Sequence, residues 1–241
     1  MGAVSAQLES GPLTAGAGRG RGDEGVAVVI AIMALLLMTA LGVAINLTVT
    51  AETMIAGNFL ASAEAFYAAD AVGERAIGDL RTVSDWTMVL SGGVRSAFVD
   101  GAPEGTRRLA DGTTIDLTSV VNTANCNKVT ACRDADMDAV TAARPWGANN
   151  PRWQLYAYGD LNRMVPSGAT TSSYYVLAMV ADDGSENDGN PLRDGTDGIN
   201  PGAGVLALRA EAFGARGAHK AIEMTLAHPP AVRMLSWRSL R

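Results

Sequence analysis

Histidine and cysteine are scarce in this chain, and their scarcity limits the chemistry that it can perform. The 241 residues include two histidines, His219 and His228, and two cysteines, Cys126 and Cys132. A structural zinc site needs four nitrogen or sulfur ligands close together, and these residues do not supply such a set. Neither histidine has an evident nucleophile or carboxylate partner, and no serine stands in a Gly-x-Ser-x-Gly turn. We therefore expect both histidines at the surface and predict that the chain is not an enzyme.

An excess of positive charge is also missing. The sequence has 19 lysine and arginine residues against 25 aspartate and glutamate residues, which gives a net charge of -6. Nucleic-acid binding requires basic side chains that neutralise phosphates. No nucleic-acid partner is predicted.

Charge is wholly absent from residues 26–51, "VAVVIAIMALLLMTALGVAINLTVTA". A membrane-spanning helix needs about 20 apolar residues, so this run is long enough. The competing interpretation is a signal peptide, whose apolar core is shorter, at about 7–15 residues. Arg19 and Arg21 precede the run. The positive-inside rule therefore places the amino terminus in the cytoplasm and exports the rest of the chain.

The helical pattern continues beyond the apolar run, through residues 52–84. Apolar residues recur there at three- and four-residue spacing, which is typical of an amphipathic helix. The stripe consists of Ile55, Phe59, Ala63, Phe66, Ala69 or Val72, Ala76 and Leu80. The pattern predicts one helix of roughly 55 residues that ends near Ser84. Gly42, Gly57 and Gly73 lie inside it as weak points, at about 1 kcal/mol each relative to alanine.

Shorter apolar runs after Trp86 predict strands. Within residues 105–121, "GTRRLADGTTIDLTSVV", Asp111-Gly112 separates two possible strands in a hairpin, the second of which includes "LTSVV". Residues 153–158 alternate, "SYYVLAMVADD" is typical of a central strand, and two more strands flank residues 214–217. The predicted fold is α+β, with an antiparallel sheet packed on the second half of the long helix. Its predicted parts are a leader (1–25), an apolar half-helix (26–51), an amphipathic half-helix (52–84), an exported β-rich domain (85–228) and a tail or edge strand (229–241).

Two features of the exported domain are candidate sites. The close spacing of Cys126 and Cys132 favours a disulfide formed in an oxidising compartment, although two free cytoplasmic thiols are the alternative. The acidic, glycine-rich segment 181–202 offers hard oxygen ligands suited to Ca²⁺, with a solvated connection as the alternative. Its candidate ligands are Asp182, Asp183, Glu186, Asp188, Asp194 and Asp197.

A weaker calcium candidate lies earlier in the chain. Asp134, Asp136 and Asp138 are followed by Asn149 and Asn150, but the segment lacks the glycine and terminal glutamate of an EF-hand. We interpret it as a short helix or turn.

Two stretches of the helical region carry a family resemblance. Glu52, Met54 and the "AGN" of residues 56–58 match a Glu-x-Met-x-Ala-Gly-Asn element, and "AFYAADA" at 65–71 matches a following Ala-Phe-x-Ala-Ala-Glu-Ala pattern. Together with the apolar run they resemble the amino-terminal region of PilX-type minor pilins of type IV pilus systems. The resemblance implies a type IV pilin-like fold, in which a long amino-terminal helix packs on a carboxy-terminal antiparallel sheet.

The resemblance also implies processing. In this family a prepilin peptidase cuts after a glycine that precedes the apolar run, and Gly25 matches that position, so that Val26 becomes the methylated first residue. Major pilins carry a glutamate five residues into the mature chain, where this sequence has Ile30. Loss of that carboxylate implies a minor, priming or tip-proximal subunit.

The sequence thus leads to two functional hypotheses. The first is a minor pilin held in the bacterial inner membrane, then packed through its helix into a type IV pilus at the cell surface. Its implied partners are other pilins, prepilin peptidase, the inner-membrane assembly machinery and membrane lipid. The second is a single-pass membrane protein whose exported domain binds a ligand or partner and never joins a filament.

Overall fold

The computed structural model describes residues 23–139, 149–164, 172–195, 200–228 and 230–240. The chain divides into two compact units, Met1–Ile55 and Ala56–Arg241. One helix, α1 (Asp23–Leu80), runs through 58 residues and contributes to both. The single long helix predicted from the sequence is therefore present, although it ends at Leu80 rather than near Ser84. There the Thr82 hydroxyl and amide both donate to the Asp79 carbonyl in a turn.

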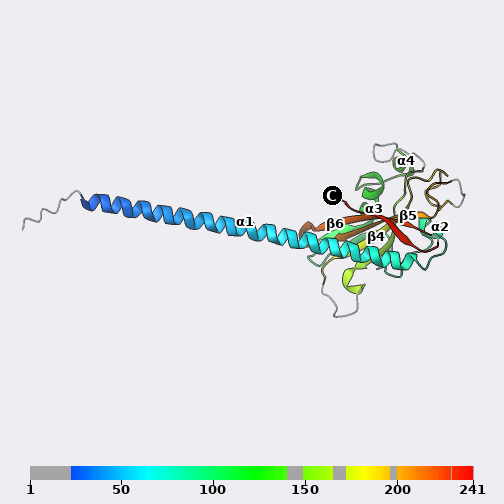
Figure 1. Cartoon of the computed structure of the whole chain (residues 1–241), viewed down its shortest axis with the longest axis horizontal. Helices are drawn as coiled ribbons and strands as arrows, with labels where there is room; N and C mark the ends of the chain where they lie inside the picture. The colour runs from blue at the N-terminus through cyan, green and yellow to red at the C-terminus, as the bar shows by residue number, and fades with distance from the viewer. Residues whose placement is uncertain (1–22, 140–148, 165–171, 196–199, 229, 241) are drawn as a thin grey trace, which may run out of the picture. The chain divides into compact units, whose positions relative to one another are not determined.

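The second unit is built on a five-stranded antiparallel sheet, which confirms the predicted α+β class (Figure 1). The strand order follows the chain, from β3 to β7, so each strand pairs with its sequence neighbour. The strands are β3 (Gln154–Asp160), β4 (Tyr175–Asp182), β5 (Val205–Phe213), β6 (His219–Ala227) and β7 (Arg233–Leu240). Short 3-10 turns, η2 (Leu161–Arg163) and η3 (Ala215–Gly217), follow β3 and β5.

The carboxy-terminal part of α1 covers one face of this sheet. Its buried residues are Ala65, Ala68, Ala69, Val72, Ala76, Ile77 and Leu80. Most are alanines, so the contact is made by small side chains that allow a close approach. Ile55 and Phe59, which the sequence pattern placed on the buried stripe, are instead exposed, because this packing begins only near Ala65.

Gly73 explains part of that close approach. A Cβ at this position would lie 2.8 Å from the Met224 terminal carbon of β6. The glycine that looked like a weak point of the helix is therefore a packing position. Gly78, five residues later, has nothing within 4 Å of the same hypothetical atom.

The opposite face of the sheet is covered by α3 (Leu117–Cys126) and by the loops around it. The hairpin predicted at Asp111-Gly112 is present, but its strands β1 (Thr106–Arg108) and β2 (Thr114–Asp116) have only three residues each. The following "LTSVV", expected as strand, is helical instead. Asp116 caps the helix by accepting a 2.8 Å hydrogen bond from the Ser119 amide, which is the preferred chemistry of a helix start.

Layers on both faces account for the apolar run in β4. All eight of its residues are buried, as expected for an inner strand covered on both sides. Two one-turn helices complete the described elements, α2 (Thr87–Leu90) and α4 (Asp134–Met137). The latter agrees with the short helix or turn predicted for that acidic segment.

The two edges of the sheet differ. At β3, the Ser96 amide donates to the Tyr156 carbonyl (3.0 Å) and the Tyr158 amide donates to the Phe98 carbonyl (2.9 Å). The segment 96–98 thus covers that edge. At the other edge lies β7, which pairs only with β6 among the strands that the structure describes.

Candidate functional site

The amino-terminal part of α1 presents apolar side chains on every side. Ile30 is 61 % exposed and Leu37 is 71 % exposed, and the other large apolar residues from Val26 to Val49 are similar. So continuous an apolar surface marks contact with lipid or with another protein. By length and composition, this helix can cross a membrane once.

The polar side chains within residues 26–51 are all bonded to their own helix. The Thr39 hydroxyl donates to the Leu36 carbonyl, and Asn46, Thr48 and Thr50 each donate to the carbonyl four residues earlier, at 2.8–3.1 Å. In an apolar medium a polar group without a partner is costly. These bonds fit the segment to lipid or to a bundle of helices.

The residues predicted for processing lie at the start of this helix. Gly25 and Val26 fall in the first turn of α1, which begins at Asp23. The first amides of a helix have no partner within it, and glycine adds conformational freedom, so this turn opens readily to an extended chain. Ile30 and Gly42 are exposed on the same helix, and a Cβ on Gly42 would have open space around it.

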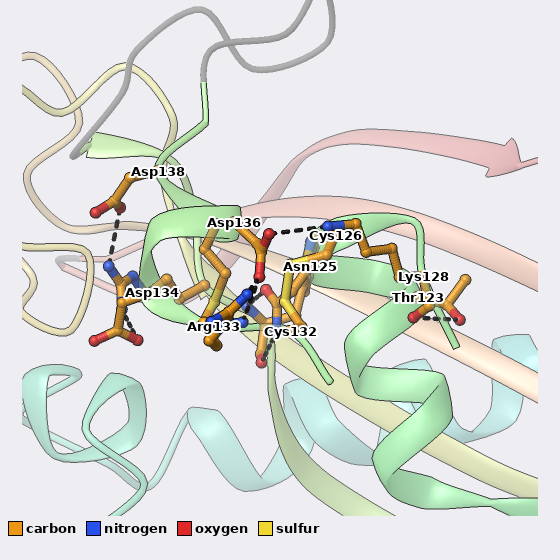
Figure 2. The surroundings of a disulfide bond; sticks show 12 residues. Thr123, Asn125, Cys126, Lys128, Cys132, Arg133, Asp134, Asp136 and Asp138 are labelled. Atoms are coloured by element: carbon orange, nitrogen blue, oxygen red, sulfur yellow. Dashed lines mark hydrogen bonds and ion pairs between the residues drawn. A yellow bond between two sulfur atoms is a disulfide. The ribbon is translucent and has the colours of Figure 1, made fainter. Parts of the chain in front are cut away.

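The two cysteines are joined. Cys126, the last residue of α3, forms a disulfide with Cys132, and their Cα atoms are 6.0 Å apart (Figure 2). Beside it, the Asn125 side chain donates to the Trp153 carbonyl (3.0 Å) and accepts from the Trp153 amide (2.7 Å). The disulfide therefore closes a loop at the point where α3 is tied to the chain entering β3.

The three aspartates after this disulfide are paired with cationic side chains (Figure 2). Lys128 binds Asp136 at 2.9 Å, and Arg152 bridges Asp134 and Asp138 with two contacts of 2.9 Å. All three carboxylates of this segment are thus engaged in ion pairs with the protein's own cations. Asn150 belongs to the same weaker calcium candidate, and its side chain donates a hydrogen bond to the Met137 carbonyl.

The acidic segment after β4 is organised by its carboxylates. Asp182 and Glu186 are each only 2 % exposed. The Glu186 carboxylate accepts bonds from the Gly195 amide (3.1 Å) and the Asn200 amide group (2.7 Å), and Asp194 accepts one from the Gly204 amide (2.7 Å). These bonds fold the loop back on itself.

Asp183 and Asp188 lie further out in the same loop. Each accepts a hydrogen bond from an amide two residues later, at Ser185 (2.7 Å) and Asn190 (2.8 Å). Asp197, the sixth predicted ligand, lies outside the described residues. Among the residues that the structure does describe, no three acidic, histidine or cysteine side chains converge in a geometry able to hold a metal ion.

Burial makes these carboxyl groups weaker acids than they are in water. Loss of hydration raises the pKa of Asp182 to about 8, with a further contribution from the negative charge of Glu186. Burial also raises the pKa of Glu186 and of Asp194, although the amides that they bind oppose the shift. At neutral pH the Asp182 carboxyl group therefore favours its protonated form.

A second polar group lies on the opposite side of the sheet from α1, in a cleft of about 230 Å³ between α3 and strands β5 and β6. The buried Glu211 contacts Arg209 (Nε–Oε1 2.6 Å) and His219 (Nε2–Oε2 2.7 Å). Burial alone would raise the pKa of Glu211, but the hydrogen bond from His219 and the charge of Arg209 outweigh it and lower that pKa.

His219 therefore has the carboxylate partner that the sequence did not reveal. Its ring also stacks on Phe213, with centroids 4.5 Å apart. The predicted hairpin could have revealed this contact. Residues two apart on one strand face the same side, so Glu211 and Phe213 share a face of β5, and His219 lies opposite Phe213 at the start of β6. His228, half-buried, lies 5.5 Å from the Trp86 ring.

Fold and surface together define an α+β protein whose amino-terminal helix fits a single-pass membrane anchor. Comparisons with protein-family models, with curated proteins and with solved structures found no match.

Proposed function

We propose that this protein is a PilX-type minor pilin, a subunit that helps to assemble or prime a type IV pilus or a related filament. The observation that carries the proposal is the division of α1. Its first half exposes apolar side chains on all sides, and its second half packs an alanine-rich face on an antiparallel sheet. Such a helix serves two environments in turn, the bilayer and then the core of a helical filament.

The assembly step follows from the same surface. The precursor sits in the inner membrane with its sheet domain exported, and prepilin peptidase removes the leader after Gly25. Removal of the charged leader leaves the apolar half-helix free to leave the bilayer and pack against the helices of other pilins. Its polar side chains already have partners within the helix, so the transfer exposes no unbonded polar group.

In this proposal, the residue at position 30 decides where in the filament the subunit can sit. A new terminal amine buried among apolar helices requires a negative partner, and in major pilins the glutamate at this position supplies it to a neighbour. With isoleucine there, this subunit cannot neutralise the amine of an adjacent one. It therefore suits a place in the filament that lacks one neighbour, such as the tip. The exported domain supplies an outward surface without catalysis.

The test is processing of the full chain. Co-expression with a prepilin peptidase should remove residues 1–25 and yield a methylated Val26, which intact-mass measurement detects. Gly25→Leu should stay uncut, because a side chain there hinders the extended approach to the peptidase. Gly20→Leu is the matched control and should be cut normally.

An unchanged mass for the wild-type chain would contradict the proposal. That outcome favours a permanent single-pass anchor whose exported domain binds a partner. Cleavage within the apolar run, or at a different glycine, would also remove the argument based on Ile30.

A further inference from the structure

The edge strand β7 is open along its outer side. Within the described parts of the chain, its backbone bonds go to β6 alone, whereas segment 96–98 covers the opposite edge at β3. An open edge presents unpaired amides and carbonyls that can accept another strand. The contrast between the two edges singles out β7 as the place where the sheet can be extended.

The two faces of β7 differ in chemistry. Met234 and Trp237 lie opposite Leu226 and Met224 of the apolar face that α1 covers, and the Trp237 ring meets Phe66 edge-on at 5.7 Å. Both side chains are nevertheless 42 % exposed. They form an exposed apolar strip on β7, and no described strand lies beyond it.

The other face of β7 is cationic. Arg238 pairs with Glu223 across the strands at 2.5 Å, and Arg233 is exposed, with no carboxylate partner in the described ranges. No acidic residue follows Glu223 in the sequence, although the whole chain has a net charge of -6. The open edge is thus a positive strip on an acidic protein.

We propose that β7 binds an extended acidic segment of a partner protein by strand addition. The segment would alternate apolar residues, which pack beside Met234 and Trp237, with acidic residues, which lie beside Arg233 and Arg238. A bulge between Thr225 and Leu226 shifts the β6–β7 register. The edge therefore has two regular parts, residues 233–234 and 236–240, and the incoming strand pairs along both.

Charge argues against a second copy of this chain as the occupant. A second β7 would add two more arginines to the same edge and no carboxylate to pair with them. A strand with carboxylates relieves the positive strip instead. The inference concerns the sheet domain alone and holds whether or not the helix joins a filament, so its test and the processing test fail independently.

The test uses the full chain in uncharged detergent micelles and two labelled peptides of eight residues. One peptide alternates glutamate with valine, and the other alternates lysine with valine. Fluorescence anisotropy at low salt should show the acidic peptide binding about tenfold more tightly than the basic one, because exposed charge pairs contribute modestly and additively. Hydrogen exchange should slow within residues 233–240 and stay unchanged in β3.

Two variants locate the contact. Arg233→Glu should weaken binding of the acidic peptide about three- to tenfold and strengthen binding of the basic peptide. Arg95→Glu is the matched control, because Arg95 is exposed beside the covered edge at β3, and it should change neither. Equal binding of the two peptides, protection confined to residues outside 233–240, or an equal effect of both variants would overturn the proposal. Dimerisation through β7 without peptide would overturn it as well.

Discussion

Asp182 is the residue whose replacement should change the stability of this protein most informatively. It lies at the end of β4, is 2 % exposed, and accepts a 3.0 Å hydrogen bond from the Asp183 amide. Burial and the neighbouring charge of Glu186 raise its pKa from 3.8 to about 8. The substitution Asp182→Asn keeps the size of the side chain and its acceptor oxygen, and it removes the titration.

The sign follows from proton binding. The folded state holds the Asp182 proton more tightly than the unfolded state does, so this group destabilises the fold progressively as pH rises from about 4 to about 8. By pH 7, about three units above the ordinary pKa, this loss corresponds to about 4 kcal/mol, at 1.36 kcal/mol for each unit. Water entry and small backbone movements relax such sites, and we expect about 1–3 kcal/mol.

The assay is urea unfolding of the full chain in detergent micelles, followed by tryptophan fluorescence between pH 4.5 and 8.5. Asp182→Asn should be more stable than the wild type at pH 7–8 and nearly equal to it at pH 4.5. Asp188→Asn, at an exposed position of the same loop, is the control. It should change the wild-type pH profile only slightly, because the charge of Asp188 makes a minor contribution to the raised pKa of Asp182. An Asp182→Asn profile parallel to the wild type would refute the reasoning.

The same assay tests the calcium hypothesis. A bound cation favours ionised carboxylates, so added Ca²⁺ should flatten the wild-type pH profile and raise its unfolding midpoint if the loop holds the ion. An identical profile with Ca²⁺ and with a chelator would contradict calcium binding.

Two further predictions use the same measurement. Gly78→Ala should stabilise the protein by about 1 kcal/mol through helix propensity, whereas Gly73→Leu should destabilise it by about 1–3 kcal/mol because the side chain meets Met224; equal effects would contradict the close packing of α1. Replacing Cys126 and Cys132 together by serine should lower the free energy of unfolding by about 2 kcal/mol, and a reducing agent should do the same to the wild type and nothing to the variant.

The elements with strong periodic patterns could be predicted from the sequence. The long helix, the run of β4 and the β5–β6 hairpin all followed from apolar spacing, because each has a face or a full surface to bury. Residues 117–121, which the sequence predicts as strand, form the start of α3 instead. The β-branched residues of this stretch favour strands, but the Asp116 cap and packing against the sheet make it helical.

The sites divide in the same way. The sequence by itself determined that an uncharged helical segment begins near Gly25, that two cysteines lie within reach of each other, and that acidic residues are concentrated in the segment after β4. These are local properties of spacing and composition, which no packing can change. Only the tertiary structure decided that Asp182 is buried, that Glu211 contacts His219, that Arg152 bridges two aspartates, and that β7 is an open edge among the described strands. Each depends on which segments distant in the chain come together, and the hydrophobic pattern alone leaves that choice undetermined.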